Sequence, residues 1–196
     1  MPRSVWSQEL YIRAYRFAAE AHRWQRVPGT HLPYIMHLSF TAMEVLAAAS
    51  VEDIGDADLA VQCALLHDVL EDTLIRREQL GKEFGEAVRH GVEALTLNKR
   101  LSRSEQMAEC LERISRQPRE IWVVKMADRI TNLQPPPRHW KEKRIRDYHE
   151  EARVILVSKD ENTSQPDIID ELMAHNLKQP ENIAWLFCLY QPAGLP

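Results

Sequence analysis

The chain has 196 residues and a formal net charge of −4, which fits one domain and gives no excess of positive charge for wholesale binding to nucleic acid or anionic membranes. Only six residues are glycine, about 3% against a usual share of roughly 7%. The sequence contains neither G-x-G-x-x-G nor G-x-x-x-x-G-K-[ST], so it argues against Rossmann and P-loop phosphate cradles. A protein of this composition that handles phosphate must use side chains and a metal ion.

The cysteines and the apolar stretches indicate the compartment. Cys63, Cys110 and Cys188 are odd in number and far apart, which fits neither a disulfide framework nor a C-x-x-C zinc or redox site. The longest apolar stretches are shorter than a membrane span, and the first ten residues contain no apolar signal core. We therefore expect a soluble, cytoplasmic protein without membrane or nucleic-acid partners.

Apolar residues recur at helical spacing along most of the chain. In the first such segment Leu10, Ala14 and Phe17 recur every three or four residues, with charged residues between them. Asp56 is placed to cap the N-terminus of the third helical segment. The predicted helices span about 7–25, 35–49, 57–72, 76–80, 84–96, 102–116, 139–157, 165–178 and 181–190. The sequence has no repeat, low-complexity tract or linker, so we predict a single domain over residues 1–196.

One segment is ambiguous. Residues 121–127, IWVVKMA, are apolar and rich in β-branched side chains, and taken alone they also fit a buried strand. The three prolines at 135–137 end whatever element precedes them.

The segment with the most chemistry is HDVLEDT, residues 67–73. On a continuous helix His67 lies one turn from Glu71, and Asp68 lies one turn from Asp72. These polar side chains follow an apolar run, so they must face solvent, pair with cations or bind a metal, because burying them unpaired costs several kcal/mol. Taken alone, the segment fits a solvated helix end.

Two further segments extend the pattern. His37 lies in YIMHL and Asp128 in VVKMADRITN, which gives the order H…HD…D with His67 and Asp68 in the middle. Two imidazoles and two carboxylates suit a divalent ion such as Mn, Fe, Co, Ni or Zn. Such an ion polarises a phosphoryl group and lowers the pKa of bound water. This ligand set explains how phosphate is handled without glycine loops.

The H…HD…D order is the signature of HD-domain phosphohydrolases. The surrounding segments resemble the hydrolase domain of RelA/SpoT proteins, and most of all the hydrolase-only small alarmone hydrolases of the metazoan SpoT homologue type. These segments are AHRWQR (21–26), PYIMH (33–37), ALLHDVLEDT (64–73), FGEAV (84–88), VKMADRITNL (124–133) and RIRDY (144–148). They run in order over about residues 10–157. The resemblance implies an all-α, single helical bundle, with a helix at 121–127.

The resemblance also implies a site and a reaction. The implied metal is Mn²⁺, held by His37, His67, Asp68 and Asp128. The implied catalytic residues are Glu71 and Asp72, which activate or orient the attacking water. The implied reaction removes pyrophosphate from the ribose 3′ position of (p)ppGpp and leaves GDP or GTP.

A polyanionic substrate needs a cationic and aromatic lining. By position in the family motifs, the expected substrate-binding residues are Arg26, Tyr34, Lys99, Asn132, Arg144 and Tyr148. An arginine offers a two-pronged phosphate contact and a lysine a point charge. For Lys99, Arg144 and Tyr148 a solvated or packing role is an equal alternative, and Lys125 is a candidate partner for an acid of the site.

Several positions depart from the family pattern. Met36 and Leu38 flank the first ligand histidine where Asn and Pro are usual, Val27 stands where a basic residue is common, and RITN replaces RLHN after Asp128. We expect these changes at the substrate rim. They keep open a second interpretation, a hydrolase of another phosphorylated nucleotide such as NADPH (at its 2′-phosphate), ppApp or a nucleoside monophosphate.

A third interpretation is a non-catalytic nucleotide-binding module, and the presence of every proposed ligand and both acids argues against it. The segment from about 160 to 190 carries no such chemistry. Its apolar side chains, Trp185, Phe187, Leu189 and Tyr190, are expected to pack in the core or at a homo-oligomer contact. The length leaves room for a hydrolase domain and little else.

Overall fold

The computed structural model describes residues 6–51, 53–132, 141, 143–144, 147, 150–152 and 154–155. Within these ranges the chain forms eight helices and no strand: α1 (Gln8–Ala21), α2 (Ile35–Val51), α3 (Ala57–Leu66), α4 (Val69–Asp72), α5 (Arg77–Phe84), α6 (Glu86–Leu95), α7 (Arg103–Ile114) and α8 (Arg119–Asn132). The all-α prediction is confirmed. The helices predicted at 165–178 and 181–190, and much of the one at 139–157, lie outside the described residues.

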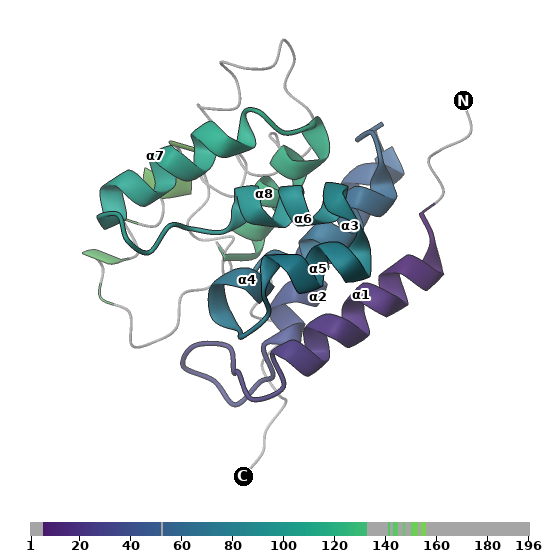
Figure 1. The fold of residues 1–196 in the computed structure, drawn as a ribbon. Coiled ribbons are helices and arrows are strands. Elements are labelled where there is room, and N and C mark those ends of the chain that lie inside the picture. The colour runs from purple at the N-terminus through teal and green to yellow at the C-terminus, as the bar shows by residue number, and fades with distance from the viewer. Residues whose placement is uncertain are drawn as a thin grey trace.

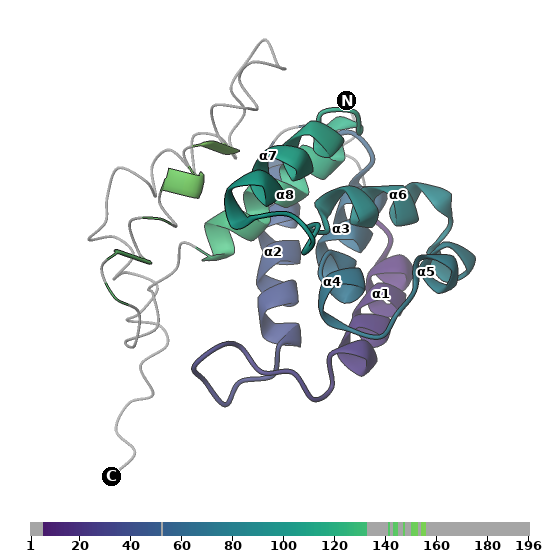
Figure 2. The ribbon, with the colours of Figure 1, turned by 60° about the vertical axis from the view of Figure 1, so that its left-hand side comes forward.

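The bundle is centred on α3, which packs against α1, α2, α6 and α8 (Figure 1). Figure 2 shows α2, α3 and α1 side by side, with α5 and α6 paired on one flank. α7 packs on α6, and α8 reaches in to contact both α2 and α3. Among the described helices, none combines the length and the apolar character that a membrane crossing requires.

Local sequence explains where the central helix begins. The Asp56 carboxylate caps α3 by accepting a hydrogen bond of 3.0 Å from the backbone N–H of Leu59. Seven consecutive residues that follow, from Ala60 to Leu66, are buried. A helix that is apolar almost all round has no solvent face, so it becomes the centre around which the other helices pack.

The ambiguous segment 121–127 is helical and lies in α8, so the strand alternative is wrong. Twelve consecutive residues of α8, from Glu120 to Thr131, are buried. Burial on all sides removes the polar face that would have revealed the helical period. The β-branched residues are accommodated because packing against α2 and α3 outweighs a weak intrinsic preference.

The predicted continuous helix over 57–72 is divided in the structure. α3 ends at Leu66, and α4 begins at Val69. Between them Asp68 has φ −97° and ψ −3°, a sparsely populated conformation, and its carbonyl accepts a new hydrogen bond from the N–H of Asp72 at 2.9 Å. The break gives the two halves of HDVLEDT different neighbours, because His67 and Asp68 face α8 whereas Glu71 contacts the loop after α6.

A glycine allows α6 to approach the central helices. A Cβ at Gly91 would lie 2.5 Å from Cδ1 of Ile121 and 2.7 Å from Sγ of Cys63. Both distances are shorter than any ordinary contact between such atoms, so α6 can pack this closely on α3 and α8 only without a side chain at this position.

Candidate active site

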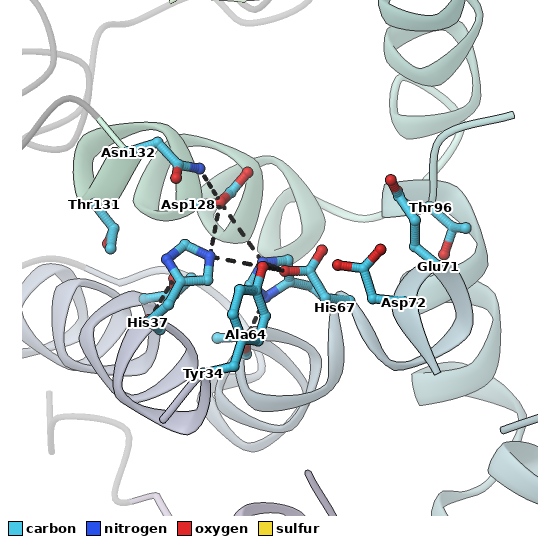
Figure 3. A network of polar contacts seen from close by, with 12 residues as sticks. Tyr34, His37, Ala64, His67, Glu71, Asp72, Thr96, Asp128, Thr131 and Asn132 are labelled. Carbon is cyan, nitrogen blue, oxygen red and sulfur yellow. Dashed lines mark hydrogen bonds and ion pairs between the residues drawn. The ribbon is translucent and has the colours of Figure 1, made fainter. Parts of the chain in front are cut away.

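The four predicted metal ligands converge from three parts of the fold, and Figure 3 shows three of them, His37, His67 and Asp128, close together. His37 lies near the start of α2, His67 and Asp68 lie at the break between α3 and α4, and Asp128 lies on α8. The His67 Nε2 atom is 3.1 Å from Asp68 Oδ2 and 3.6 Å from Asp128 Oδ1. The His37 Nε2 atom is 3.8 Å and 3.4 Å from the same two oxygens. His37 and His67 are 30 positions apart in the chain and Asp68 and Asp128 are 60 apart, yet the fold brings one ligand atom of each to the same place.

These distances fit a single metal ion. Two atoms that each bind one ion at about 2.1 Å are at most about 4.2 Å apart, and all four separations lie inside this limit. One ligand atom each from His37, His67 and Asp128 lies within 4.8 Å of the others. Mixed imidazole and carboxylate donors suit a divalent transition ion.

The orientation of His67 supports the same interpretation. Its Nδ1 is 2.8 Å from the carbonyl oxygen of Ala64, so this nitrogen carries the hydrogen and donates it. Its Nε2 is buried and has no hydrogen-bond partner, although two carboxylate oxygens face it. A histidine held at one ring nitrogen by a backbone carbonyl, with its other nitrogen directed at the carboxylates of the cluster, is arranged as a metal ligand.

The charges around the cluster call for a cation. Burial lowers the pKa of the His67 imidazole, but the carboxylates of Asp68 and Asp128 outweigh it and raise that pKa well above its usual value. Burial likewise raises the pKa of both carboxyl groups, and the facing imidazoles more than reverse this. Two carboxylates that are this close and largely shielded from solvent are stable only with positive charge beside them, which a divalent ion supplies.

Three side chains hold the two carboxylate ligands from outside the cluster. The Tyr34 hydroxyl donates to Asp68 Oδ2 at 2.6 Å, and the Asn132 amide donates to Asp128 Oδ1 at 2.6 Å. The Lys125 ammonium lies 3.8 Å from Asp128 Oδ2, so it does pair with an acid of the site. Such outer contacts orient metal ligands. The nomination of Tyr34 and Asn132 as substrate-binding residues stays a prediction.

The acid pair lies beside the cluster on α4, with the Asp72 carboxylate toward it (Figure 3). Glu71 Oε2 accepts a hydrogen bond of 2.9 Å from the N–H of Leu97, in the loop after α6. Burial raises the pKa of Glu71, and the Leu97 N–H partly opposes this shift. The pair is thus held against a loop about 26 residues further along the chain, which the one-helix expectation did not anticipate.

Lys99 lies on this pair. Its ammonium donates to the Glu71 carbonyl at 3.0 Å and to Asp72 Oδ1 at 3.2 Å, and it is 3.6 Å from Glu71 Oε1. Its partial burial lowers its pKa, but the two carboxylates outweigh this and raise it, so Lys99 is cationic. Its side chain remains 61% exposed, so the ammonium is also open to solvent.

The remaining predicted residues differ in what the structure shows. Arg26 is exposed, and its guanidinium is 3.3 Å from the carbonyl oxygens of Arg23 and Gln25. Arg144 is exposed, and Tyr148 lies outside the described residues. Leu38, expected at the substrate rim, is fully buried in the core, so that expectation is wrong for this position. A leucine there fills space between helices.

The sequence interpretation missed Gln25. Its side-chain amide donates to Asp72 Oδ2 at 3.1 Å, so it contacts the acid pair directly. Gln25 lies inside the segment AHRWQR, in which the family motif indicates only Arg26 as a substrate contact. A neutral amide gives no signal of its own, and only the folded arrangement brings residue 25 to residue 72.

Comparison with known proteins identifies the family of this chain. Residues 14–156 match the family model for the HD domain. The guanosine-3′,5′-bis(diphosphate) 3′-pyrophosphohydrolase MESH1 of Xenopus tropicalis is 35% identical over 153 residues, which cover 75% of this chain and 83% of that protein. The MESH1 of Homo sapiens is 32% identical over 175 residues, covering 86% and 93%.

A solved structure described as a metazoan ortholog of SpoT that hydrolyzes ppGpp superimposes with a TM-score of 0.76 at 23% identity, covering 91% of this chain and 99% of that one. This likeness concerns the fold. Together with the family model and the sequence relatives, it shows that the chain belongs to the HD-domain family. HD hydrolases use a divalent metal, and the group of His37, His67 and Asp128 is placed to hold one.

Proposed function

We propose that this chain is a metal-dependent hydrolase that removes the 3′-pyrophosphate of (p)ppGpp and leaves GDP or GTP. The observation that carries the proposal is the four-ligand cluster with the Glu71–Asp72 pair directly beside it. The MESH1 proteins, which are named for this reaction, align with most of the chain and support the choice of substrate.

The metal we propose is Mn²⁺, held by His37, His67, Asp68 and Asp128. When bound, it supplies a Lewis acid for phosphoryl oxygens. The outer contacts keep the ligands in place without it, because Tyr34 fixes Asp68, Asn132 fixes Asp128 and the Ala64 carbonyl fixes His67. The ligands are thus oriented by the protein before substrate arrives.

The acid pair provides the base. We assign Glu71 and Asp72 the task of orienting the attacking water and accepting its proton, a contribution of about 10²–10⁴ in rate for a positioned general base. Glu71 is held by the Leu97 N–H, and its side chain is 18% exposed. Asp72 is more open, at 30%, and therefore meets the water side of the site.

The substrate rim completes the proposal. Lys99 offers an exposed ammonium next to the acid pair, suited to a phosphate oxygen of a polyanion. Arg26, Tyr34, Asn132, Arg144 and Tyr148 remain the proposed further contacts. A cytoplasmic location, one domain over residues 1–196 and a homo-oligomer contact near the C-terminal segment belong to the same proposal.

The test is hydrolysis by the purified full chain. Protein loaded with Mn²⁺ should release labelled pyrophosphate from 3′-labelled ppGpp, and Asp128→Ala should not. A metal-loaded wild-type chain that releases none would refute the proposal. A panel with NADPH, ppApp and nucleoside monophosphates tests the alternative substrates, because a rim without the usual basic residue at Val27 favours that alternative. If ppGpp fails to lead the panel in kcat/KM, the substrate assignment is wrong.

A further inference from the structure

We propose that Gln25 is a positioning residue for Asp72, that His22 orients its amide, and that Lys99 holds the opposite carboxylate oxygen. The inference rests on the proposed function, since it gives these residues a task in aiming one member of the acid pair. None of these three side chains is a proposed metal ligand.

The two oxygens of Asp72 are held from opposite sides. The Gln25 amide nitrogen donates to Oδ2 at 3.1 Å, and the Lys99 ammonium donates to Oδ1 at 3.2 Å. The donors come from two separate loops, one after α1 and one after α6, whereas Asp72 ends α4. A carboxylate with a donor on each oxygen cannot rotate about its last bond without breaking one of them.

His22 determines which end of the amide faces Asp72. Its Nδ1 is 2.6 Å from Gln25 Oε1, and an amide oxygen can only accept, so Nδ1 must carry the hydrogen. The amide nitrogen is then left to face Asp72 as a donor. The reverse orientation would place the amide oxygen against a carboxylate oxygen, which pairs two acceptors. The hydrogen bonds therefore run in one direction, from His22 through Gln25 to Asp72.

The burial of the His22 ring also indicates that its hydrogen is on Nδ1, as this direction of the hydrogen bonds requires. The residue is 2% exposed, and its Nε2 is buried with no hydrogen-bond partner. An N–H buried without an acceptor is costly, so the hydrogen belongs on Nδ1, where it has one. Burial also lowers the pKa of His22, even though Gln25 and the nearby carboxylates oppose the shift, which keeps the ring neutral at pH 7.

The backbone around Gln25 is fixed as well. Its N–H donates to the His22 carbonyl at 2.9 Å, and its own carbonyl accepts from the N–H of Tyr34 at 3.1 Å. The His22 ring lies against the Tyr34 ring, with centroids 5.1 Å apart, and the Tyr34 hydroxyl holds Asp68. One short segment thus supports both a metal ligand and the neighbouring acid, which is the arrangement of a preorganised site.

The first experiment compares Gln25→Leu with a matched glutamine elsewhere. Gln106 on α7 also uses its amide, donating to the Leu101 carbonyl at 2.9 Å. We expect Gln25→Leu to lower kcat by about 10- to 100-fold with KM and metal content within about twofold, since misplacing a catalytic group by about 1 Å has effects of this size. Gln106→Leu should leave kcat unchanged. An equal loss in both variants, or a change confined to KM, would overturn the proposal.

A double-mutant comparison shows whether Gln25 acts through Asp72. In an Asp72→Asn background, single-turnover rates with and without Gln25→Leu should differ by less than about twofold, because the group to be positioned has lost its function. The same fold loss in both backgrounds would contradict the proposal. Gln25→Glu, which keeps the size but replaces the donor by a second negative charge beside Asp72, should lower kcat in the wild-type background at least as much as Gln25→Leu does.

A second readout needs no substrate. Imidazole ¹⁵N shifts of the full chain should show His22 as the neutral Nδ1–H tautomer at pH 7, and Gln25→Leu should shift the Nδ1 resonance. The Nε2–H tautomer would refute the direction of the hydrogen bonds. A wild-type chain that shows the Nδ1–H tautomer but does not act on ppGpp would refute the proposed function and leave the orientation of Gln25 standing.

Discussion

Replacing Glu71 by Gln should lower kcat strongly while changing the free energy of unfolding only a little. Gln keeps the shape of Glu and an oxygen that can accept the hydrogen bond from the Leu97 N–H, 2.9 Å away. Lys99 loses its 3.6 Å ion pair with Glu71 Oε1 but keeps its 3.0 Å hydrogen bond to the Glu71 backbone carbonyl and its contact with Asp72. The substitution therefore removes the charge, the proton acceptor and one ion pair, and leaves the hydrogen bonds with the Leu97 N–H and the Lys99 ammonium in place.

The two expected magnitudes differ widely. A hydrogen bond to a charged group contributes about 1.5–3 kcal/mol and a neutral one about 0.5–1.5, so the weakened Leu97 contact costs about 1 kcal/mol of the free energy of unfolding. Relief of the burial of the Glu71 charge offsets part of this cost. Loss of the base should lower kcat by about 10²–10⁴, which is about 3–5 kcal/mol in the activation barrier.

The assay measures three quantities on the same preparation. Pyrophosphate release gives kcat, thermal unfolding gives Tm, and elemental analysis gives the metal content. We expect kcat of Glu71→Gln to fall at least a hundredfold while Tm changes by only a few degrees and the metal content stays at the wild-type level. A kcat within about threefold of the wild type would refute the assigned role of Glu71.

Three further predictions follow from other contacts. In metal-free protein, the Tm of Glu71→Gln should rise relative to that of the wild type as pH increases from 4 to 7. The pKa of Glu71 is higher in the folded chain than in the unfolded chain, so the wild type loses stability as pH rises through the interval between the two values. A Tm difference between the two proteins that does not change with pH would contradict this. A chelator should lower the Tm of the wild type and leave the Tm of Asp128→Ala unchanged. The loss corresponds to about 2.7 kcal/mol of the free energy of unfolding if the free metal concentration was 100 times its Kd. Equal shifts in both proteins would show that the cluster is not the binding site. Gly91→Ala should destabilise by about 1–3 kcal/mol in urea unfolding, since its Cβ would lie 2.5 Å from Ile121 and 2.7 Å from Cys63, and a neutral result would mean that α6 moves away freely.

The sequence predicted the bundle because most of its helices have a solvent face, and it was ambiguous where they do not. In α8 burial on all sides hides the helical period, so Ile121 to Ala127 fitted a strand until the resemblance to a family favoured a helix. The division of the 57–72 helix was not predicted, because nothing in HDVLEDT itself breaks a helix. The break depends on partners from elsewhere, such as Tyr34, which holds Asp68.

Some residues of the candidate site could also be predicted from the sequence, and others could not. Charged and metal-binding side chains such as His37 and Asp128 stand out in a sequence, because burying them needs a partner. Neutral residues that work by orientation do not stand out, and Gln25 and the N–H of Leu97 became visible only once residues 25, 72 and 97 lay together. Lys99 is indicated by its position in the family motif, and its contacts to both members of the acid pair could not be predicted from spacing alone.

The product ratio from ppGpp, followed by ³¹P NMR with the Mn²⁺-loaded full chain, tests whether this protein is a 3′-pyrophosphohydrolase. We expect loss of the 3′-diphosphate signals with GDP and intact pyrophosphate appearing in a ratio of one to one, and no reaction by Asp128→Ala. Release of single phosphates, attack at the 5′ position, or an inert metal-loaded wild type would contradict it.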